Sequence, residues 1–175
     1  AESGAEAKLF TGAWLGDLKS FFDAVDHDTL DTAADKHEFP KVIYGCGMAQ
    51  YQAPRCLQTK DGVAEVLHPT VGILAGCGLA KVLTTLYYLT PMDEFVKRHP
   101  HITTTIYIDD IHLSCSLPDR GQVSILLSLA VEDLCQVIEN ELHCKLAPGK
   151  EAVVASDPVL AEDIRARLGP LAGEA

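Results

Sequence analysis

The stretch from Ile102 to Ser116, ITTTIYIDDIHLSCS, constrains the fold more than any other part of the chain. Two runs of β-branched and aromatic residues flank Asp109 and Asp110, so we predict a tight β-hairpin with the acids at its turn. Successive side chains of a strand point to opposite faces, and neighbouring acids therefore reach one site only at or beside a turn. Two carboxylates about 4 Å apart repel by roughly 4 kcal/mol at an effective dielectric constant near 20. A bound cation or a proton would relieve that repulsion.

A third acid follows another predicted strand. Residues 9–18 are mostly apolar and predict a strand, with Asp17 near its end. If this strand neighbours the hairpin, Asp17, Asp109 and Asp110 meet at one edge of a sheet. Carboxylate oxygens are the ligands that Mg²⁺ and Mn²⁺ prefer, and two such ions can align a hydroxyl and a phosphoryl group for displacement. The alternative is that these residues are turn and capping acids without an ion, since Asp is common in turns.

The 175 residues show neither an internal repeat nor a linker, and predict one domain. Apolar residues at helical spacing predict helices, and alternating runs predict strands. The predicted helices are 27–37, 39–52, a long helix that ends near 98, 120–144 and 158–168, and the further strands are a hairpin at 54–68 and a strand at 151–156. This order indicates an α+β fold, with an antiparallel sheet whose helices lie mainly on one face.

The chain is acidic, with a formal net charge of -11, and lacks the basic surface of an autonomous nucleic-acid binder. Any polyanion would have to be held by local cations, a metal ion or partner subunits. The six cysteines are dispersed without zinc-site spacing, so we expect most to be reduced and buried, in a soluble protein of a reducing compartment. Residues 71–90 predict a buried helix with the loop before it, and a transmembrane span is the weaker alternative.

Four segments, in order, resemble the motifs of a reverse-transcriptase palm. DLKSFFDAVDHDTL resembles motif A, HPTVGILAGCGLAKVL motif B, YIDD the Tyr-x-Asp-Asp box, and LAPGKEAVVAS motif D. The chain is similar to the reverse-transcriptase-like proteins of dinoflagellate non-LTR-type retroelements. The resemblance implies a polymerase palm at 14–157, with a ferredoxin-like antiparallel sheet. Residues 1–13 would be an N-terminal extension, and 158–175 a C-terminal helix and tail.

The resemblance also implies catalytic roles. Asp17, Asp109 and Asp110 would hold two Mg²⁺ or Mn²⁺ ions for template-directed nucleotidyl transfer to a primer. Lys150 would donate a proton to the departing pyrophosphate. Without the resemblance, Lys150 is simply a solvated lysine after the turn that Pro148 and Gly149 predict.

Four further residues would bind the substrate. Phe22 stands where the family has the steric gate that excludes a ribose 2′-OH, although a core aromatic is the simpler interpretation of this residue alone. Gly72, Ala75 and Gly76 belong to the motif B loop, where tight turns and close packing also explain the glycines. The motif usually has Gln where Ala75 stands, so a nucleotide contact is missing.

Two functions remain open from the sequence. The family's fingers and thumb do not fit before Trp14 or after Asp157, so we expect an isolated chain to hold primer-template nucleic acid and deoxynucleotide poorly. The alternative is a catalytically silent palm, retained as a structural or interaction subunit of a larger protein complex. The chain opens on Ala1. We therefore expect a processed form or a piece of a longer precursor, and an organelle entered after removal of a leader is one expected compartment.

Overall fold

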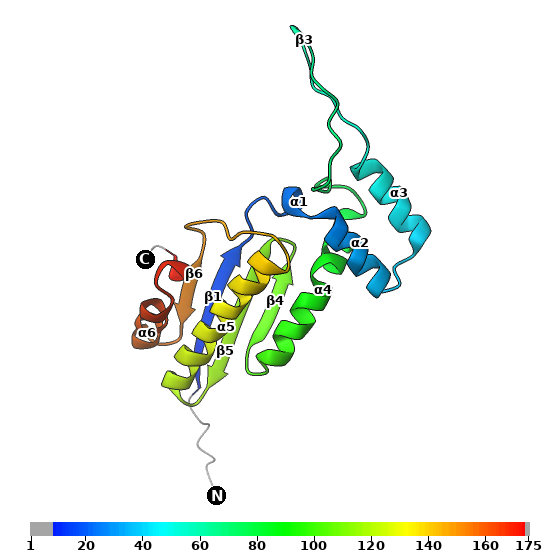
Figure 1. Ribbon diagram of the computed structural model, residues 1–175. Helices are drawn as coiled ribbons and strands as arrows, with labels where there is room; N and C mark the ends of the chain where they lie inside the picture. The colour runs from blue at the N-terminus through cyan, green and yellow to red at the C-terminus, as the bar shows by residue number, and fades with distance from the viewer. Residues whose placement is uncertain (1–8, 174–175) are drawn as a thin grey trace, which may run out of the picture.

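The computed structural model describes residues 9–173 and is built on a four-stranded antiparallel sheet (Figure 1). The strand order is β4-β5-β1-β6, so the first strand of the chain lies in the middle of the sheet. The strands are β1 (Phe10–Asp17), β4 (Thr103–Tyr107), β5 (Asp110–Leu117) and β6 (Ala152–Ala155). Helices α5 (Arg120–Asn140) and α6 (Pro158–Leu168) pack on one face. The predicted α+β fold with helices mainly on one face is therefore confirmed.

Alternation along β1 separates a buried face from an open face. Trp14 points to the helices, opposite Leu113 of β5 and Val153 of β6, and all three are buried. The next residue, Leu15, points the other way, and its neighbours are His112 and Ala152. The residues of this second row are exposed or half-buried, so the sheet offers one uncovered surface.

Trp14 is the largest fully buried side chain and fixes the middle of the sheet. Its ring lies over Gly16, where an added Cβ would overlap the ring atoms. Its Nε1 donates a hydrogen bond of 2.7 Å to the carbonyl oxygen of Leu171, in the 3₁₀ helix η1 (Gly169–Ala172). One side chain thus connects the first strand to the last described turn.

Helix α5 covers the sheet because one side of it is apolar at helical spacing. The Asp119 carboxylate accepts a hydrogen bond of 2.9 Å from the backbone N–H of Gln122 and caps the first turn. The buried apolar stripe is Val123, Leu127, Ala130, Val131, Leu134, Val137 and Ile138. Among the described residues, α5 alone is long and apolar enough to cross a membrane, with a mean hydropathy of 1.4, but half of that window is buried inside the protein.

The remaining helices flank the β4 side of the molecule, and a thin arm projects from it (Figure 1). They are α1 (Phe21–Ala24), α2 (His27–Lys36), α3 (Lys41–Tyr51) and α4 (Ala80–Arg98). The arm is the predicted hairpin at 54–68. Its strands β2 (Gln58–Thr59) and β3 (Gly62–Val63) have only two residues each. One further antiparallel β-bridge joins Arg55 and Leu67.

One boundary and one burial pattern differ from the prediction. Helix α5 ends at Asn140 rather than 144. Residues 71–79 form the loop that was predicted before the long helix. Strand β1 lies within the strand predicted at 9–18, and residues 1–8 of the predicted extension at 1–13 lie outside the described part. Of six unpaired cysteines only Cys115 and Cys144 are buried. Cys46 and Cys56 are exposed, because α3 and the arm lie away from the sheet.

Candidate metal and nucleotide site

The three predicted acids meet at one end of the two central strands. Asp17 ends β1 and pairs directly with Asp110, the first residue of β5. Asp109 lies in the turn, and its carbonyl oxygen accepts a hydrogen bond of 2.9 Å from the backbone N–H of Leu18. One carboxylate oxygen from each of Asp17, Asp109 and Asp110 lies within 4.8 Å of the other two.

The turn that presents Asp109 has an uncommon backbone. Its two central residues are Ile108 and Asp109, and Ile108 has φ of 61°. A positive φ at the first central position suits a hairpin, whose primed turns match the twist of the strands. A β-branched residue is rarely found there, because its side chain crowds the backbone. Backbone strain of this kind gathers at functional sites, so the turn supports a site at these acids.

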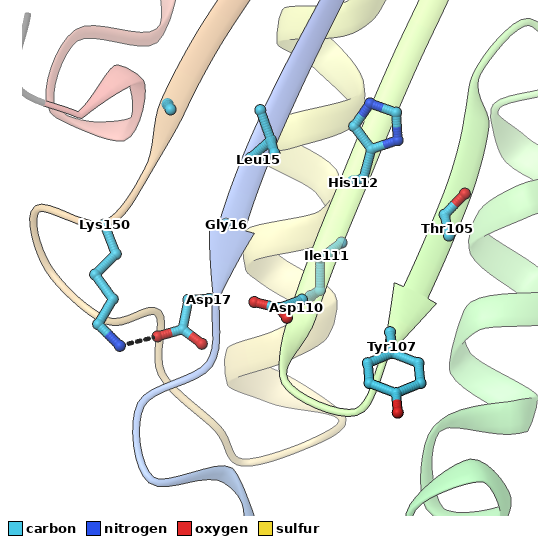
Figure 2. Close-up of a pocket in the computed structure, with 10 residues that line it drawn as sticks. Leu15, Gly16, Asp17, Thr105, Tyr107, Asp110, Ile111, His112 and Lys150 are labelled. Carbon is cyan, nitrogen blue, oxygen red and sulfur yellow. Dashed lines mark hydrogen bonds and ion pairs between the residues drawn. The ribbon is translucent and has the colours of Figure 1, made fainter.

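Lys150 reaches the same acids from the loop between α5 and β6. Its ammonium donates a hydrogen bond to Asp17 Oδ2 and forms an ion pair with it (Figure 2). The backbone N–H of Ala147 donates to the carbonyl oxygen of Asp17 over 2.8 Å, which holds the loop to the end of β1. The hydrogen bond to Asp17, and then the charges of Asp17, Asp109 and Asp110, raise the pKa of Lys150. Lys150 therefore stays protonated at neutral pH.

A hollow of about 490 Å³ adjoins the acids on the side of α1. Phe22 and Ala75 line it together with Asp17, Asp109 and Lys150, so the structure brings these five predicted residues to one place. Ala75 contributes only a methyl group. No side-chain hydrogen bond can therefore reach a ligand from this position.

The two predicted glycines do not line that hollow. The backbone N–H of Gly72 donates to the carbonyl oxygen of Val25 over 2.7 Å, and its own carbonyl accepts from the His27 ring over 2.8 Å. An added Cβ would lie 3.4 Å from the carbonyl oxygen of Asp23, so Gly72 packs the loop against the α1–α2 segment. Gly76 has φ of 81° and open space around it. A substrate role for either glycine stays a prediction.

The open face of the sheet adjoins the three acids and carries a second hollow. This hollow, of about 670 Å³, runs from the acids across the middle strands (Figure 2). Leu15, Thr105, His112 and Ala152 line it. None of these four residues was predicted as part of a site, although strand alternation applied to all four strands places them on one face. Tyr107 lies at its edge, with the Lys81 ammonium 5.2 Å from the ring centre.

Carboxylate oxygens at this spacing fit a divalent cation. Mg²⁺ binds hard oxygen ligands at about 2.1 Å, so two ligands of one ion lie at most about 4.2 Å apart. Oxygens within 4.8 Å of one another therefore need only a small movement of their side chains to share one ion. The three acids come from two strands and a turn that hydrogen bonds fix, and waters or a substrate phosphate would complete the coordination. The donor set, of oxygens alone, favours Mg²⁺ or Mn²⁺ over softer metals.

Neither a protein-family model nor a curated protein matches the sequence. Solved structures do match. A telomerase from Candida tropicalis, truncated from the C-terminal domain, aligns with a TM-score of 0.64 over 85% of this chain, at 12% identity. The fold is reverse-transcriptase-like. Telomerase from Candida tropicalis bound to a fragment of telomeric RNA has a TM-score of 0.66 over 89% of the chain at 13% identity.

Telomerase from Candida albicans with the corresponding RNA fragment has a TM-score of 0.61 over 87% of the chain, at 12% identity. The chain spans 31% of the truncated Candida tropicalis telomerase and 27% of each of the two RNA-bound telomerases. At this identity the likeness concerns the fold alone.

Proposed function

We propose that this chain is a reverse-transcriptase-like palm that transfers nucleotides to a primer on a template with the help of two divalent metal ions. The observation that supports this most is the meeting of Asp17, Asp109 and Asp110 at the ends of β1 and β5. Because the chain spans only about a third of the telomerase chains or less, fingers and thumb would come from other parts of a longer polypeptide or from another chain.

Each residue of the site has a defined task in this proposal. Asp17, Asp109 and Asp110 would hold Mg²⁺ or Mn²⁺, which when bound supplies charge neutralisation and activation of the primer hydroxyl. Phe22, on the wall of the smaller hollow, would exclude a ribose 2′-OH. The Lys150 ammonium has a proton that Nζ can give to the leaving pyrophosphate. The open face of the sheet would lie against the primer-template duplex.

Primer extension tests this function. The chain in its native complex is given a primer on an RNA or a DNA template, a deoxynucleotide and Mg²⁺ or Mn²⁺. Loss of a direct ligand should cost at least about a hundredfold in rate, so Asp109→Asn should abolish extension. Asp61→Asn, at the tip of the arm, is the matched control and should extend normally. Extension that survives Asp109→Asn does not come from this site, and a native complex without extension contradicts the proposal.

A second function is favoured by the arm. Leu57, Val63 and Leu67 are each more than 60% exposed, and a lone two-stranded hairpin is only marginally stable in water. A partner protein that covers these side chains would stabilise the arm, so the chain would serve as a structural or interaction subunit. Ala75 supports this alternative, because it offers the smaller hollow no polar contact.

Copurification separates the second function from the first. The double variant Leu57→Ser with Val63→Ser should lose a stable partner that the unchanged chain retains. Val159→Ser removes an exposed apolar residue from α6 and should not. A chain that always elutes alone, or a partner retained by the double variant, speaks against the interaction subunit. Neither result depends on the metal site.

Origin and compartment belong to the same proposal. Four motifs in order support descent from a retroelement, and we propose one of the dinoflagellate non-LTR type. Six unpaired cysteines, two of them exposed, favour a reducing compartment. An organelle is one such compartment, and cell fractionation with a specific antibody would identify it.

A further inference from the structure

A third hollow lies behind the loop that presents Lys150. It measures about 350 Å³ and is enclosed by the end of α5, the loop at 145–151 and the C-terminal helix η1. Most of its wall is apolar, from Ile138, Leu146, Pro148, Pro170 and Leu171. Its size and apolar wall are those of a small-molecule site rather than of a solvent channel.

One acid in this apolar hollow has no counter-charge. Glu151 is 8% exposed, and its Oε2 accepts a hydrogen bond of 2.9 Å from the backbone N–H of Gly149. No cation of residues 9–173 forms an ion pair with it, although Lys145 stands at the rim. A buried carboxylate is costly unless a positive group pairs with it. The hollow is therefore suited to a ligand that brings a positive charge.

The electrostatic potential in this hollow is negative, because further acidic residues lie near Glu151. Glu139 lines the rim. Burial, and then the charges of Glu139, Glu151 and Glu132, together raise the pKa of the Cys135 thiol to about 11. An anion would be repelled here, and a neutral molecule would leave the buried carboxylate unpaired.

We infer that this hollow binds a small organic cation, with an ammonium or amidinium group against Glu151 and an apolar body against Leu146 and Leu171. The site is also placed to affect the metal and nucleotide site. Pro148 lines both this hollow and the one beside the three acids. The Glu151 carboxylate, which a ligand would contact, holds the Gly149 turn next to Lys150. A bound cation would compete with that hydrogen bond and shift Lys150 relative to Asp17.

The test is a titration followed by amide NMR, and it does not depend on catalysis. Benzamidine, cationic at neutral pH, is compared with benzamide, its neutral counterpart of the same shape. We expect saturable shifts at the Gly149 and Leu171 amides with benzamidine and much weaker binding of benzamide. Glu151→Gln keeps an oxygen for the Gly149 N–H but removes the charge, and should weaken benzamidine binding by about tenfold. Glu139→Gln, at the rim, should weaken it by less.

Several outcomes overturn the inference. They are an absence of saturable shifts in the folded chain, equal affinity for benzamide, and undiminished binding by a Glu151→Gln variant that melts at the original temperature. A peptide with a single arginine provides the remaining comparison. If it binds more tightly than benzamidine at the same amides, the site belongs to a protein side chain and not to a small molecule. Each of these results leaves the proposed polymerase function unaffected.

Discussion

Asp17 and Asp110 lie directly opposite each other on adjacent antiparallel strands, with both side chains on the open face of the sheet. Like charges in that relationship destabilise a sheet. The protein tolerates this pair and adds Asp109 at the same end, while Lys150 supplies one positive charge to Asp17. The repulsion between these carboxylates lowers the free energy of unfolding. A protein that keeps such a concentrated negative charge is expected to bind a cation there.

The first prediction concerns Asp110→Asn. In the presence of a chelator the variant should be as stable as the original or more stable, by up to about 1 kcal/mol, because the repulsion with Asp17 is gone. The stabilisation that Mn²⁺ gives the unchanged chain should largely disappear. Thermal melting with and without Mn²⁺ measures both effects. Asp61→Asn should keep the full Mn²⁺ response, and a full response in Asp110→Asn would show that the ion binds elsewhere.

The second prediction concerns the lysine that shares Asp17 with the metal. Lys150→Met removes a cation that competes for Asp17 Oδ2, so the variant should bind Mn²⁺ more tightly in the absence of substrate. Electron paramagnetic resonance of free Mn²⁺ during a titration measures this affinity. Primer extension should fall at the same time, since the proton donor is lost. Lys145→Met, in the same loop but not bonded to Asp17, should change neither quantity, and weaker Mn²⁺ binding by Lys150→Met would contradict the competition.

The third prediction compares two glycines. Gly16→Ala places a methyl group into the Trp14 ring and should cost about 1 to 3 kcal/mol of unfolding free energy, since overpacking forces the ring to move. Gly45 lies inside α3 with open space around it. Gly45→Ala should therefore stabilise the protein by about 0.5 to 1 kcal/mol. Urea denaturation followed by Trp14 fluorescence distinguishes the two, and equal effects would rule out the packing explanation.

The fourth prediction concerns acid stability. His99 Nε2 and the Arg98 guanidinium contact the Asp133 carboxylate, at 2.8 Å and 2.9 Å, and join α4 to α5. Partial burial on its own would raise the pKa of Asp133, but the hydrogen bonds from His99 and Arg98 and their charges lower it overall. A lowered pKa adds stability above the unfolded value of about 3.9, and this stability is lost as pH falls through the folded value.

Replacing Asp133 should make the free energy of unfolding depend less on pH in the acidic range. In Asp133→Asn the unfolding free energy should be lower than in the unchanged chain at pH 6. It should approach that of the unchanged chain as the pH falls through the lowered pKa of Asp133 in the folded protein, because the carboxyl group is then neutral in both the folded and the unfolded state. Asp93→Asn, an exposed acid of α4, is the control and should leave the curve unchanged. A constant difference between the Asp133→Asn and unchanged curves from pH 6 to pH 3 would show that charge is not involved.

The hairpin and its acids could be predicted because strand alternation and turn chemistry are local properties of the sequence. The place of Asp17 beside Asp110 followed from motif order, and Lys150 from the resemblance alone. Glu151 could not be found, since one glutamate before a short strand has no pattern that indicates burial. The ring of Trp14 over Gly16 was equally hidden, because contact between a residue and its second neighbour depends on how the sheet is covered.

The central position of β1 has a consequence for how the chain is made. The strand is synthesised before its partners β5 and β6, which follow it by about 90 residues or more. Until they emerge from the ribosome, Trp14 has no surface to pack on, and the growing polypeptide exposes an apolar segment with unpaired backbone groups. Such a segment is prone to aggregate until β5 and β6 are available to cover it.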